Sequence, residues 1–205
     1  MKAIFITGTD TGVGKTVFTG LLARYLLERG YNAVTQKWIQ TGSKGFPKDI
    51  AVHLKLMKRK RSEVRDCMQH ITPYKFKFPS SPHLAAQLEK KIIKKDKIKK
   101  SFRYLMKRFD FVIVEGIGGA LVPINKKEFV IDIAKELKVP VLIVVDNKLG
   151  AINQTLLTIE AIRRRRMEIT GIIFNNRSKG TDKRILKDNI RIIKNISGEK
   201  VMGVF

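Results

Sequence analysis

Two patterns of apolar residues alternate along the chain. Short segments rich in apolar and β-branched residues, bounded by loops, predict strands at residues 2–7, 32–38, 111–115, 139–146, 169–175 and 200–205, and the near-continuous apolar runs among them, such as 2–7 and 139–146, are typical of strands buried on both faces. Between them, apolar residues recur every three or four positions, which predicts helices at residues 16–29, 48–60, 83–108, 129–137, 151–165 and 181–195. We expect breaks in the region 48–108 at Pro73, Pro79 and Pro82, because proline interrupts helical hydrogen bonding.

Strands that alternate with helices across short loops predict an α/β fold, with a mostly parallel sheet covered by helices on both faces. The 205 residues contain no internal repeat and no low-complexity linker, so we expect one domain over residues 1–205. No apolar run reaches the roughly eighteen residues of a membrane span, and residues 1–7 are interpreted as a strand rather than a signal peptide. Cys67 is the only cysteine, which excludes an intrachain disulfide and is typical of a cytoplasmic protein.

The chain is strongly basic, with 42 Lys and Arg against 18 Asp and Glu and a net charge of +24. The basic runs at residues 55–61, 90–100 and 163–166 fall on polar positions of helical patterns, which favours solvated helix faces. No aromatic residues interleave with these runs, as a base-stacking surface requires. We therefore expect no specific nucleic acid partner, and a field that attracts small anions such as ATP.

A glycine-rich loop follows the first predicted strand and ends at Gly14-Lys15-Thr16, where a helix begins. Such a loop presents backbone N–H groups to phosphate oxygens, and the helix start adds its positive dipole end. Lys15 would reach the β- and γ-phosphates, and the Thr16 hydroxyl would bind Mg²⁺. Five residues separate Gly8 from Gly14, one more than in the usual phosphate loop. The loop predicts a P-loop NTPase-like fold that binds ATP.

Other polar residues are expected at the carboxyl ends of strands, where ligands bind in parallel sheets. Lys37 ends a strand that we expect to neighbour the phosphate-loop strand, so its ammonium would lie beside the γ-phosphate. Glu115 ends the run 111–115 and is a candidate magnesium ligand, as is Asp49 in an expected irregular stretch after the second strand. The residues alone also allow simpler interpretations. Glu115 could be a charge on the surface, Asp49 an acidic residue at a helix N-terminus, and Lys37 a solvated lysine at a strand edge. Asn175 ends a further strand.

The phosphate loop, with its longer spacing, resembles that of the dethiobiotin synthetase family. The resemblance continues in the same order through Lys37…Thr41-Gly42-Ser43, Thr72-Pro73-Tyr74…Pro79-Ser80-Ser81-Pro82-His83, Val114-Glu115-Gly116-Ile117-Gly118-Gly119, Lys148-Leu149-Gly150-Ala151-Ile152-Asn153 and Gly171…Asn175. These blocks span nearly the whole chain. The resemblance implies a cyclo-ligase of biotin biosynthesis that converts ATP, carbon dioxide and diaminopelargonate to dethiobiotin, ADP and phosphate, through a carbamate that attacks the γ-phosphate.

The resemblance also implies roles for residues of this sequence. Lys15 and Lys37 would be catalytic, Lys37 by stabilising the carbamate and the transferred phosphoryl group. Thr16, Asp49 and Glu115 would hold Mg²⁺. The residues implied to contact the nucleotide and its metal are Thr11, Gly12, Val13, Gly14, Lys15, Thr16, Val17, Asp49, Glu115, Gly116, Ile117, Gly118, Asn175 and Asn176, with Asn175 recognising adenine. Those implied to contact the substrate are Thr41, Ser81, Gly150, Ala151, Ile152 and Asn153, the last four across the interface of a homodimer.

Three features differ from the family's pattern. Trp38 stands where proline is common, so we expect a different path at that strand end. Asn176 replaces a frequent aspartate, which predicts altered ribose or base contacts. The sequence ends at Val204-Phe205, where many relatives continue over the base, so it does not predict the selectivity for adenine.

Two other classes of protein share parts of this pattern. A partitioning ATPase that binds DNA usually carries a second lysine five residues before the loop lysine, where this chain has Asp10, and ends the acidic strand in aspartate rather than glutamate. A ligase that amidates a larger acid often carries a glutaminase domain, for which this chain has no room. Because the chain lacks these features of both classes, the sequence favours the cyclo-ligase.

Overall fold

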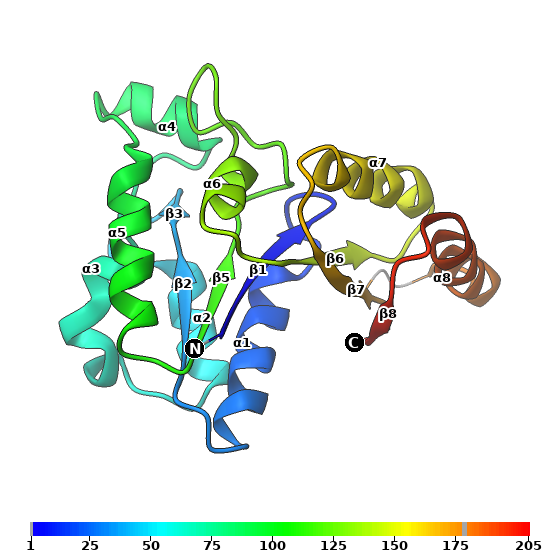
Figure 1. The fold of residues 1–205 in the computed structure, drawn as a ribbon, viewed down its shortest axis with the longest axis horizontal. Helices are drawn as coiled ribbons and strands as arrows, with labels where there is room; N and C mark the ends of the chain where they lie inside the picture. The colour runs from blue at the N-terminus through cyan, green and yellow to red at the C-terminus, as the bar shows by residue number, and fades with distance from the viewer. Residues whose placement is uncertain (1, 178–179) are drawn as a thin grey trace.

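The computed structural model describes residues 2–177 and 180–205 (Figure 1). Its main sheet has six parallel strands in the order β2-β5-β1-β6-β7-β8, which confirms the predicted α/β class. The strands are β1 (Lys2–Gly8), β2 (Ala33–Lys37), β5 (Phe111–Glu115), β6 (Val141–Asp146), β7 (Ile169–Asn175) and β8 (Val201–Val204). A second sheet pairs β3 (Ile39–Gln40) with β4 (Tyr74–Lys75).

One predicted neighbour relation is wrong. β2 does not lie beside β1, because β5 runs between them and pairs in parallel with both. The apolar run of β5 is buried on both faces and therefore fits an inner position, whereas β2 forms the edge. As a result, Lys37 pairs in register with Glu115 and not with a residue of the phosphate-loop strand.

The helices are α1 (Lys15–Leu27), α2 (Lys48–Leu56), α3 (Met68–Ile71), α4 (Pro82–Leu88), α5 (Lys95–Met106), α6 (Val130–Glu136), α7 (Ala151–Arg163) and α8 (Lys183–Ser197), with a 3-10 helix η1 at Arg61–Cys67. The helix predicted over 83–108 is two helices, and its break at 89–94 contains no proline. α4 ends at Leu88, and Lys90, two residues further on, has a φ of 51° that turns the chain so that Lys91 N–H donates to the Ala86 carbonyl at 2.8 Å.

Side chains of β1 alternate between two apolar layers, because successive residues of a strand point to opposite faces. Ile4 and Ile6 pack with Ala23 and Leu26 of α1. Phe5 belongs to the larger layer, which includes residues of α5, α6 and α7 such as Phe102, Ile131 and Ile159. Figure 1 shows α1 on one side of the sheet and α6 and α7 on the other, so both faces are covered.

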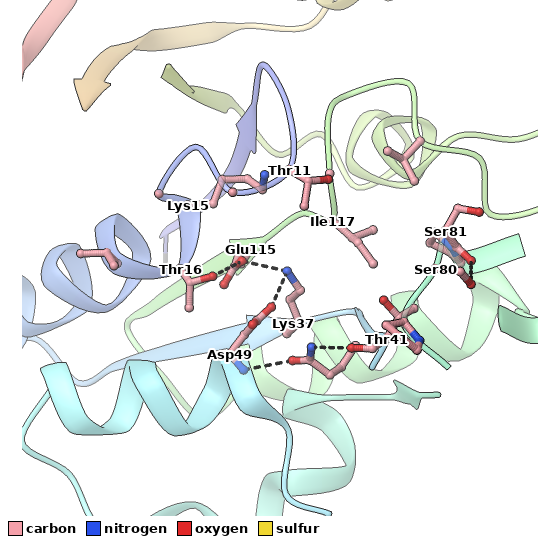
Figure 2. A pocket seen from close by; sticks show the side chains of 18 of the residues that line it. Thr11, Lys15, Thr16, Lys37, Thr41, Asp49, Ser80, Ser81, Glu115 and Ile117 are labelled. Carbon is pink, nitrogen blue, oxygen red and sulfur yellow. Dashed lines mark hydrogen bonds and ion pairs between the residues drawn. The ribbon is translucent and has the colours of Figure 1, made fainter. Parts of the chain in front are cut away.

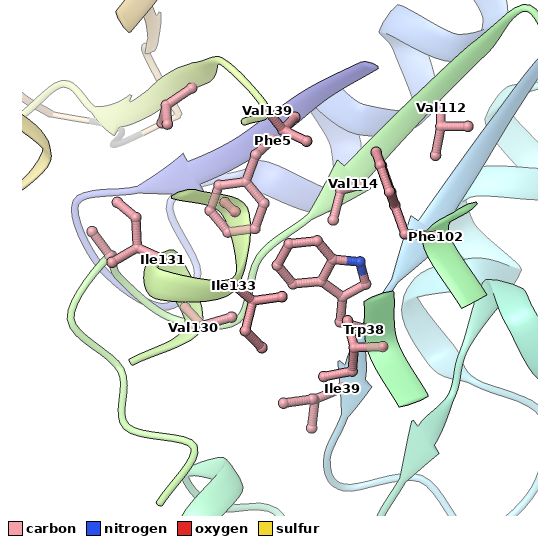
Figure 3. Packing of buried hydrophobic residues seen from close by; sticks show 14 of the residues in the cluster. Phe5, Trp38, Ile39, Phe102, Val112, Val114, Val130, Ile131, Ile133 and Val139 are labelled. Atoms are coloured by element: carbon pink, nitrogen blue, oxygen red, sulfur yellow. The ribbon is translucent and has the colours of Figure 1, made fainter. Parts of the chain in front are cut away.

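Trp38 fills the core at the point where β2 ends (Figure 3). It is 1% exposed, its ring stacks on that of Phe5 with centroids 5.1 Å apart, and its indole N–H donates to Gln36 at 2.9 Å. A Cβ on Gly116 would lie 2.9 Å from the Phe5 ring, so the glycine after β5 leaves room for this stack. The indole thus packs directly beneath the backbone that carries Lys37 and Glu115.

No helix among the described residues is long and apolar enough to cross a membrane. Cys67 is a buried free thiol at the end of η1.

Candidate active site

A cavity of about 700 Å³ opens at the carboxyl ends of the parallel strands (Figure 2). This volume lies within the usual range for sites that bind small molecules. It is lined by thirteen of the residues singled out in the sequence: Thr11, Gly12, Gly14, Lys15, Thr16, Val17, Lys37, Thr41, Asp49, Ser81, Glu115, Ile117 and Gly118. Lys15 and Lys37, far apart in the sequence, therefore face one cavity.

The phosphate loop owes its shape to two glycines in the left-handed region, Gly12 at φ 76° and Gly14 at φ 107°. Gly14 precedes the first turn of α1, whose unpaired backbone N–H groups open toward the cavity. The Lys15 ammonium donates to the Asp10 carbonyl at 2.7 Å and is 5% exposed. Burial, and secondarily the nearby Lys37 charge, lower the pKa of Lys15 to about 8. A bound anion would restore the ammonium form.

Asn175, the last residue of β7, and Arg177, two residues beyond it, hold this loop. The Asn175 side-chain N–H donates to the Val13 carbonyl at 3.0 Å, and the Arg177 guanidinium donates to the Gly12 carbonyl. A Cβ on Gly14 would lie 2.3 Å from the Asn175 amide nitrogen, so a larger residue does not fit there. Arg177 also lines the cavity, and the sequence analysis missed it, although its place two residues beyond a strand end was a usable signal.

Lys37 is the centre of a buried ionic cluster. Its ammonium lies 2.8 Å from Glu115 Oε1, 2.8 Å from Asp49 Oδ2 and 2.7 Å from the Gly116 carbonyl, so its three donors are all engaged. Burial alone would lower the pKa of Lys37, but the two carboxylates outweigh it and raise that pKa. Burial likewise opposes ionisation of Glu115, yet Lys37, followed by His53, holds its pKa far below the usual range. Lys37 and Glu115 thus form a buried ion pair.

Glu115 makes two further contacts. The Thr16 hydroxyl donates to Oε1 at 2.9 Å, and His53 Nε2 lies 2.7 Å from Oε2. The three predicted magnesium ligands are thus joined in one network, in which Thr16 and Lys37 contact Glu115 and Lys37 contacts Asp49. His53 was not predicted as a site residue, although its spacing of four residues from Asp49 places both on one face of α2.

Asp49 lies in the first turn of α2 and not in an irregular stretch, which corrects that expectation. Pro47 and Lys48 precede it, and a helix start favours an acidic residue there. The Gln40 side chain accepts from the Asp49 backbone N–H at 3.1 Å and donates to the Thr41 carbonyl at 3.0 Å. Gln40, also missed from sequence, thus links α2 to the strand that follows Lys37.

The far end of the cavity is less charged. Pro79, Ser80, Ser81 and Pro82 line it, while Val122, which also lines the cavity and which the sequence analysis did not single out, lies beside Gly118. Figure 2 shows Thr41, Ser80 and Ser81 at this end, away from Lys15 and Thr16. Hydroxyl groups beside apolar walls are suited to a small molecule with polar ends and an aliphatic body.

Eight predicted site residues are not among the described residues that line this cavity. Val13 is buried beneath the loop, and Gly116 contributes its carbonyl to Lys37. Asn175 is engaged with Val13, and Asn176 accepts from the side chain of Asn147 at 2.9 Å. Gly150, Ala151, Ile152 and Asn153 form the start of α7, where Gly150 has a φ of 88°.

Comparisons with known proteins show which family this chain is similar to. A family model described as an AAA domain matches residues 2–205. An ATP-dependent dethiobiotin synthetase of Pasteurella multocida is 41% identical over 85% of this chain and 81% of its own length. Another from Chlorobaculum tepidum is 41% identical over 94% of this chain and 80% of its own length. One from Thermodesulfovibrio yellowstonii is 34% identical over 100% of this chain and 88% of its own length.

Solved structures of similar shape show the fold alone. A MinC:MinD cell division protein complex of Aquifex aeolicus matches with a TM-score of 0.60 at 17% identity, over 100% of this chain and 81% of that one. A structure of pNOB8 ParA bound to nonspecific DNA matches with a TM-score of 0.58 at 14% identity, over 96% of this chain and 75% of that one. These likenesses confirm the P-loop NTPase-like architecture.

Proposed function

The chain belongs to the ATP-dependent dethiobiotin synthetases, ligases of biotin biosynthesis, and from that premise we propose how its residues divide the reaction. The proposal rests on one observation: the Lys15 and Lys37 side chains and two carboxylates face a single cavity at the carboxyl ends of the strands. Phosphoryl transfer depends mainly on positioning and on neutralisation of charge, which two ammonium groups supply.

In this scheme the phosphate loop, residues 11–17, binds the triphosphate of ATP. The left-handed glycines 12 and 14 and the N-terminus of α1 support this assignment. Gly116, Ile117 and Gly118 would complete the nucleotide contacts. Asn175 and Asn176 would contact the base, an assignment that rests on the family resemblance because their side chains bond to Val13 and Asn147.

We assign a magnesium site to Thr16, Asp49 and Glu115. The donor set fits, since two carboxylates and a hydroxyl are hard oxygen ligands and the remaining ligands would be phosphate oxygens and water. The Lys37 ammonium already lies within 2.8 Å of oxygens from both Asp49 and Glu115, so these groups are arranged around a cation. Magnesium would supply positive charge to the β- and γ-phosphates.

Lys37 would neutralise the carbamate formed when carbon dioxide adds to one substrate amine. A carbamate oxygen then attacks the γ-phosphorus, and ADP leaves. The second amine next attacks the carbamate carbon, which closes the cyclic urea and releases phosphate. Lys37 is placed for both steps, because it lies between the phosphate loop and the end of the cavity lined by Thr41 and Ser81.

We propose a homodimer in which residues 150–153 of one subunit bind the substrate's carboxylate in the other. The first turn of α7 directs backbone N–H groups and its positive dipole end outward, which suits a carboxylate, although the Ala151 N–H already donates to the Lys148 carbonyl. Leu149, Leu157 and Leu121 are 80%, 57% and 48% exposed, and the last two line a second cavity of about 310 Å³. Exposed apolar side chains gathered on α7 and its neighbouring loop support an interface here.

The six-stranded sheet supports the prediction of one domain over residues 1–205. A cytoplasmic location remains a prediction, since ATP and a free thiol are both typical of that compartment.

The test is ATP turnover measured with diaminopelargonate and bicarbonate, with duplex DNA, and with neither. We expect phosphate release and dethiobiotin formation only with the diamine, and no effect of DNA. Turnover stimulated by DNA alone would overturn the assignment of residues and favour a DNA-associated ATPase. Size measurement by light scattering, with Leu157→Lys as the interface variant and Leu88→Lys as an exposed control, tests the dimer.

A further inference from the structure

His53 is a fully buried histidine that the reaction scheme leaves without a role. Its Nε2 lies 2.7 Å from Glu115 Oε2, while its Nδ1 has no hydrogen-bond partner among the described residues. Ionised Glu115 can only accept, so Nε2 carries the hydrogen and donates it. An N–H at Nδ1 would be buried without an acceptor, which is unfavourable, so Nδ1 fits as a bare lone pair.

The packing of two helices fixes this contact. A Cβ on Gly20 of α1 would lie 3.3 Å from the His53 backbone and 2.7 Å from the Leu56 side chain, so α1 and α2 approach closely only because Gly20 has none. Asp49 and His53, four residues apart on α2, then face Lys37 and Glu115 respectively. One face of α2 therefore carries both Asp49, a proposed metal ligand, and His53, which donates to the second proposed ligand, Glu115.

The two oxygens of Glu115 are used differently. Oε1 faces Thr16 and Lys37, the residues nearest the assigned metal position, whereas Oε2 is held from behind by His53. A divalent cation held by Asp49 and Glu115 would compete with the Lys37 ammonium for Oε1. The bond from His53 to Oε2 needs no change and keeps the carboxylate in its orientation.

We propose that His53 is a positioning residue for magnesium, which orients Glu115 through Oε2 so that Oε1 is presented to the metal. This inference rests on the magnesium site proposed above. Partners of this kind that orient a metal ligand typically change metal affinity by about 10- to 100-fold when they are removed.

The experiment measures Mn²⁺ binding by electron paramagnetic resonance in the presence of a non-hydrolysable ATP analogue. His53→Leu keeps the volume and removes the donor, and we expect its Mn²⁺ dissociation constant to rise by about tenfold. His53→Gln retains an N–H at the same reach and should recover most of that loss. His70→Gln, a half-buried histidine on α3 away from the cavity, is the matched control and should bind Mn²⁺ like the parent.

Thermal unfolding of each variant separates structure from positioning. A lower Tm for His53→Leu with unchanged Mn²⁺ affinity would overturn the proposal and leave His53 a packing residue. Glu115→Gln tests the metal site itself: if it also binds Mn²⁺ normally, both the magnesium site and the role of His53 fall. If Glu115→Gln weakens binding and His53→Leu does not, only the role of His53 falls.

Discussion

Lys37 and Glu115 are register partners at the carboxyl ends of two adjacent parallel strands, and their side chains form an ion pair of 2.8 Å. The pairing of β2 with β5 therefore sets the distance between the ammonium that we propose as catalytic and a carboxylate that we propose as a magnesium ligand. Because a shift of one residue would turn either side chain to the opposite face of the sheet, the register is itself part of the active site.

Lys37→Ala should retain ATP binding and lose nearly all dethiobiotin formation. Removal of one charge that stabilises a transition state typically costs about 3 kcal/mol, or two orders of magnitude in rate. Calorimetry of ATP binding and an assay of the product measure the two effects separately. Lys48→Ala, an exposed lysine beside Asp49, is the control and should behave like the parent. Loss of ATP binding in Lys37→Ala would place Lys37 in the phosphate site instead.

ATP affinity should fall as the pH rises above about 8. The pKa of Lys15 is lowered to about 8 in the free protein, and bound phosphates would raise it, so binding takes up a proton between these two values. At pH 9 only about a tenth of Lys15 carries its proton, which predicts roughly tenfold weaker binding than at pH 7. Calorimetry in buffers of different ionisation enthalpy reports the proton uptake. An affinity that stays constant from pH 7 to pH 9 would contradict it.

Trp38→Ala should destabilise the fold by about 3–5 kcal/mol, because it removes a buried indole and leaves a cavity beneath the catalytic strand ends. Trp38→Phe keeps a ring against Phe5 but loses the bond to Gln36, so a smaller loss is expected. Urea unfolding measures both. Leu88→Ala, at a side chain 54% exposed, is the surface control. Equal losses for the alanine and phenylalanine variants would show that the ring stack contributes little.

Gly14→Ala should weaken ATP binding by at least tenfold. The left-handed φ of 107° costs an alanine about 1–2 kcal/mol, and its Cβ would meet Asn175 at 2.3 Å, so the loop and its anchor must both move. Gly45→Ala, where a Cβ meets nothing within 4 Å and φ is not positive, is the matched control. Titration of a fluorescent ATP analogue compares the two, and equal affinities would show that the loop absorbs the change.

Much of the fold follows from local patterns. The runs 111–115 and 169–175 are strands at the expected bounds, because unbroken apolar residues with β-branched side chains suit a sheet buried on both faces. Lys15, Lys37 and Glu115 were placed at one edge because the carboxyl ends of parallel strands meet there. The neighbour of β1 was predicted wrongly, although the apolar run of β5 fits an inner position better than the mixed sequence of β2 does.

The residues missed in the site share a physical reason. His53 contacts Glu115 across a separation of 62 residues, and Gln40 contacts the Asp49 backbone from another element nine residues away, so no motif contains both partners of either contact. Arg177 reaches the phosphate loop across a separation of 165 residues. The break after α4 was missed because it contains no proline or glycine, and Lys90 adopts the left-handed conformation that favours glycine.

Asn175 and Arg177 donate hydrogen bonds to the carbonyls of Val13 and Gly12, and these bonds fix the conformation of the phosphate loop without a nucleotide. A loop whose conformation is already fixed loses little conformational freedom when ATP binds, which favours a higher affinity for ATP. Evolution can therefore tune how tightly this enzyme holds ATP by altering the end of β7, two strands removed from β1, while the chemistry at Lys37 stays untouched.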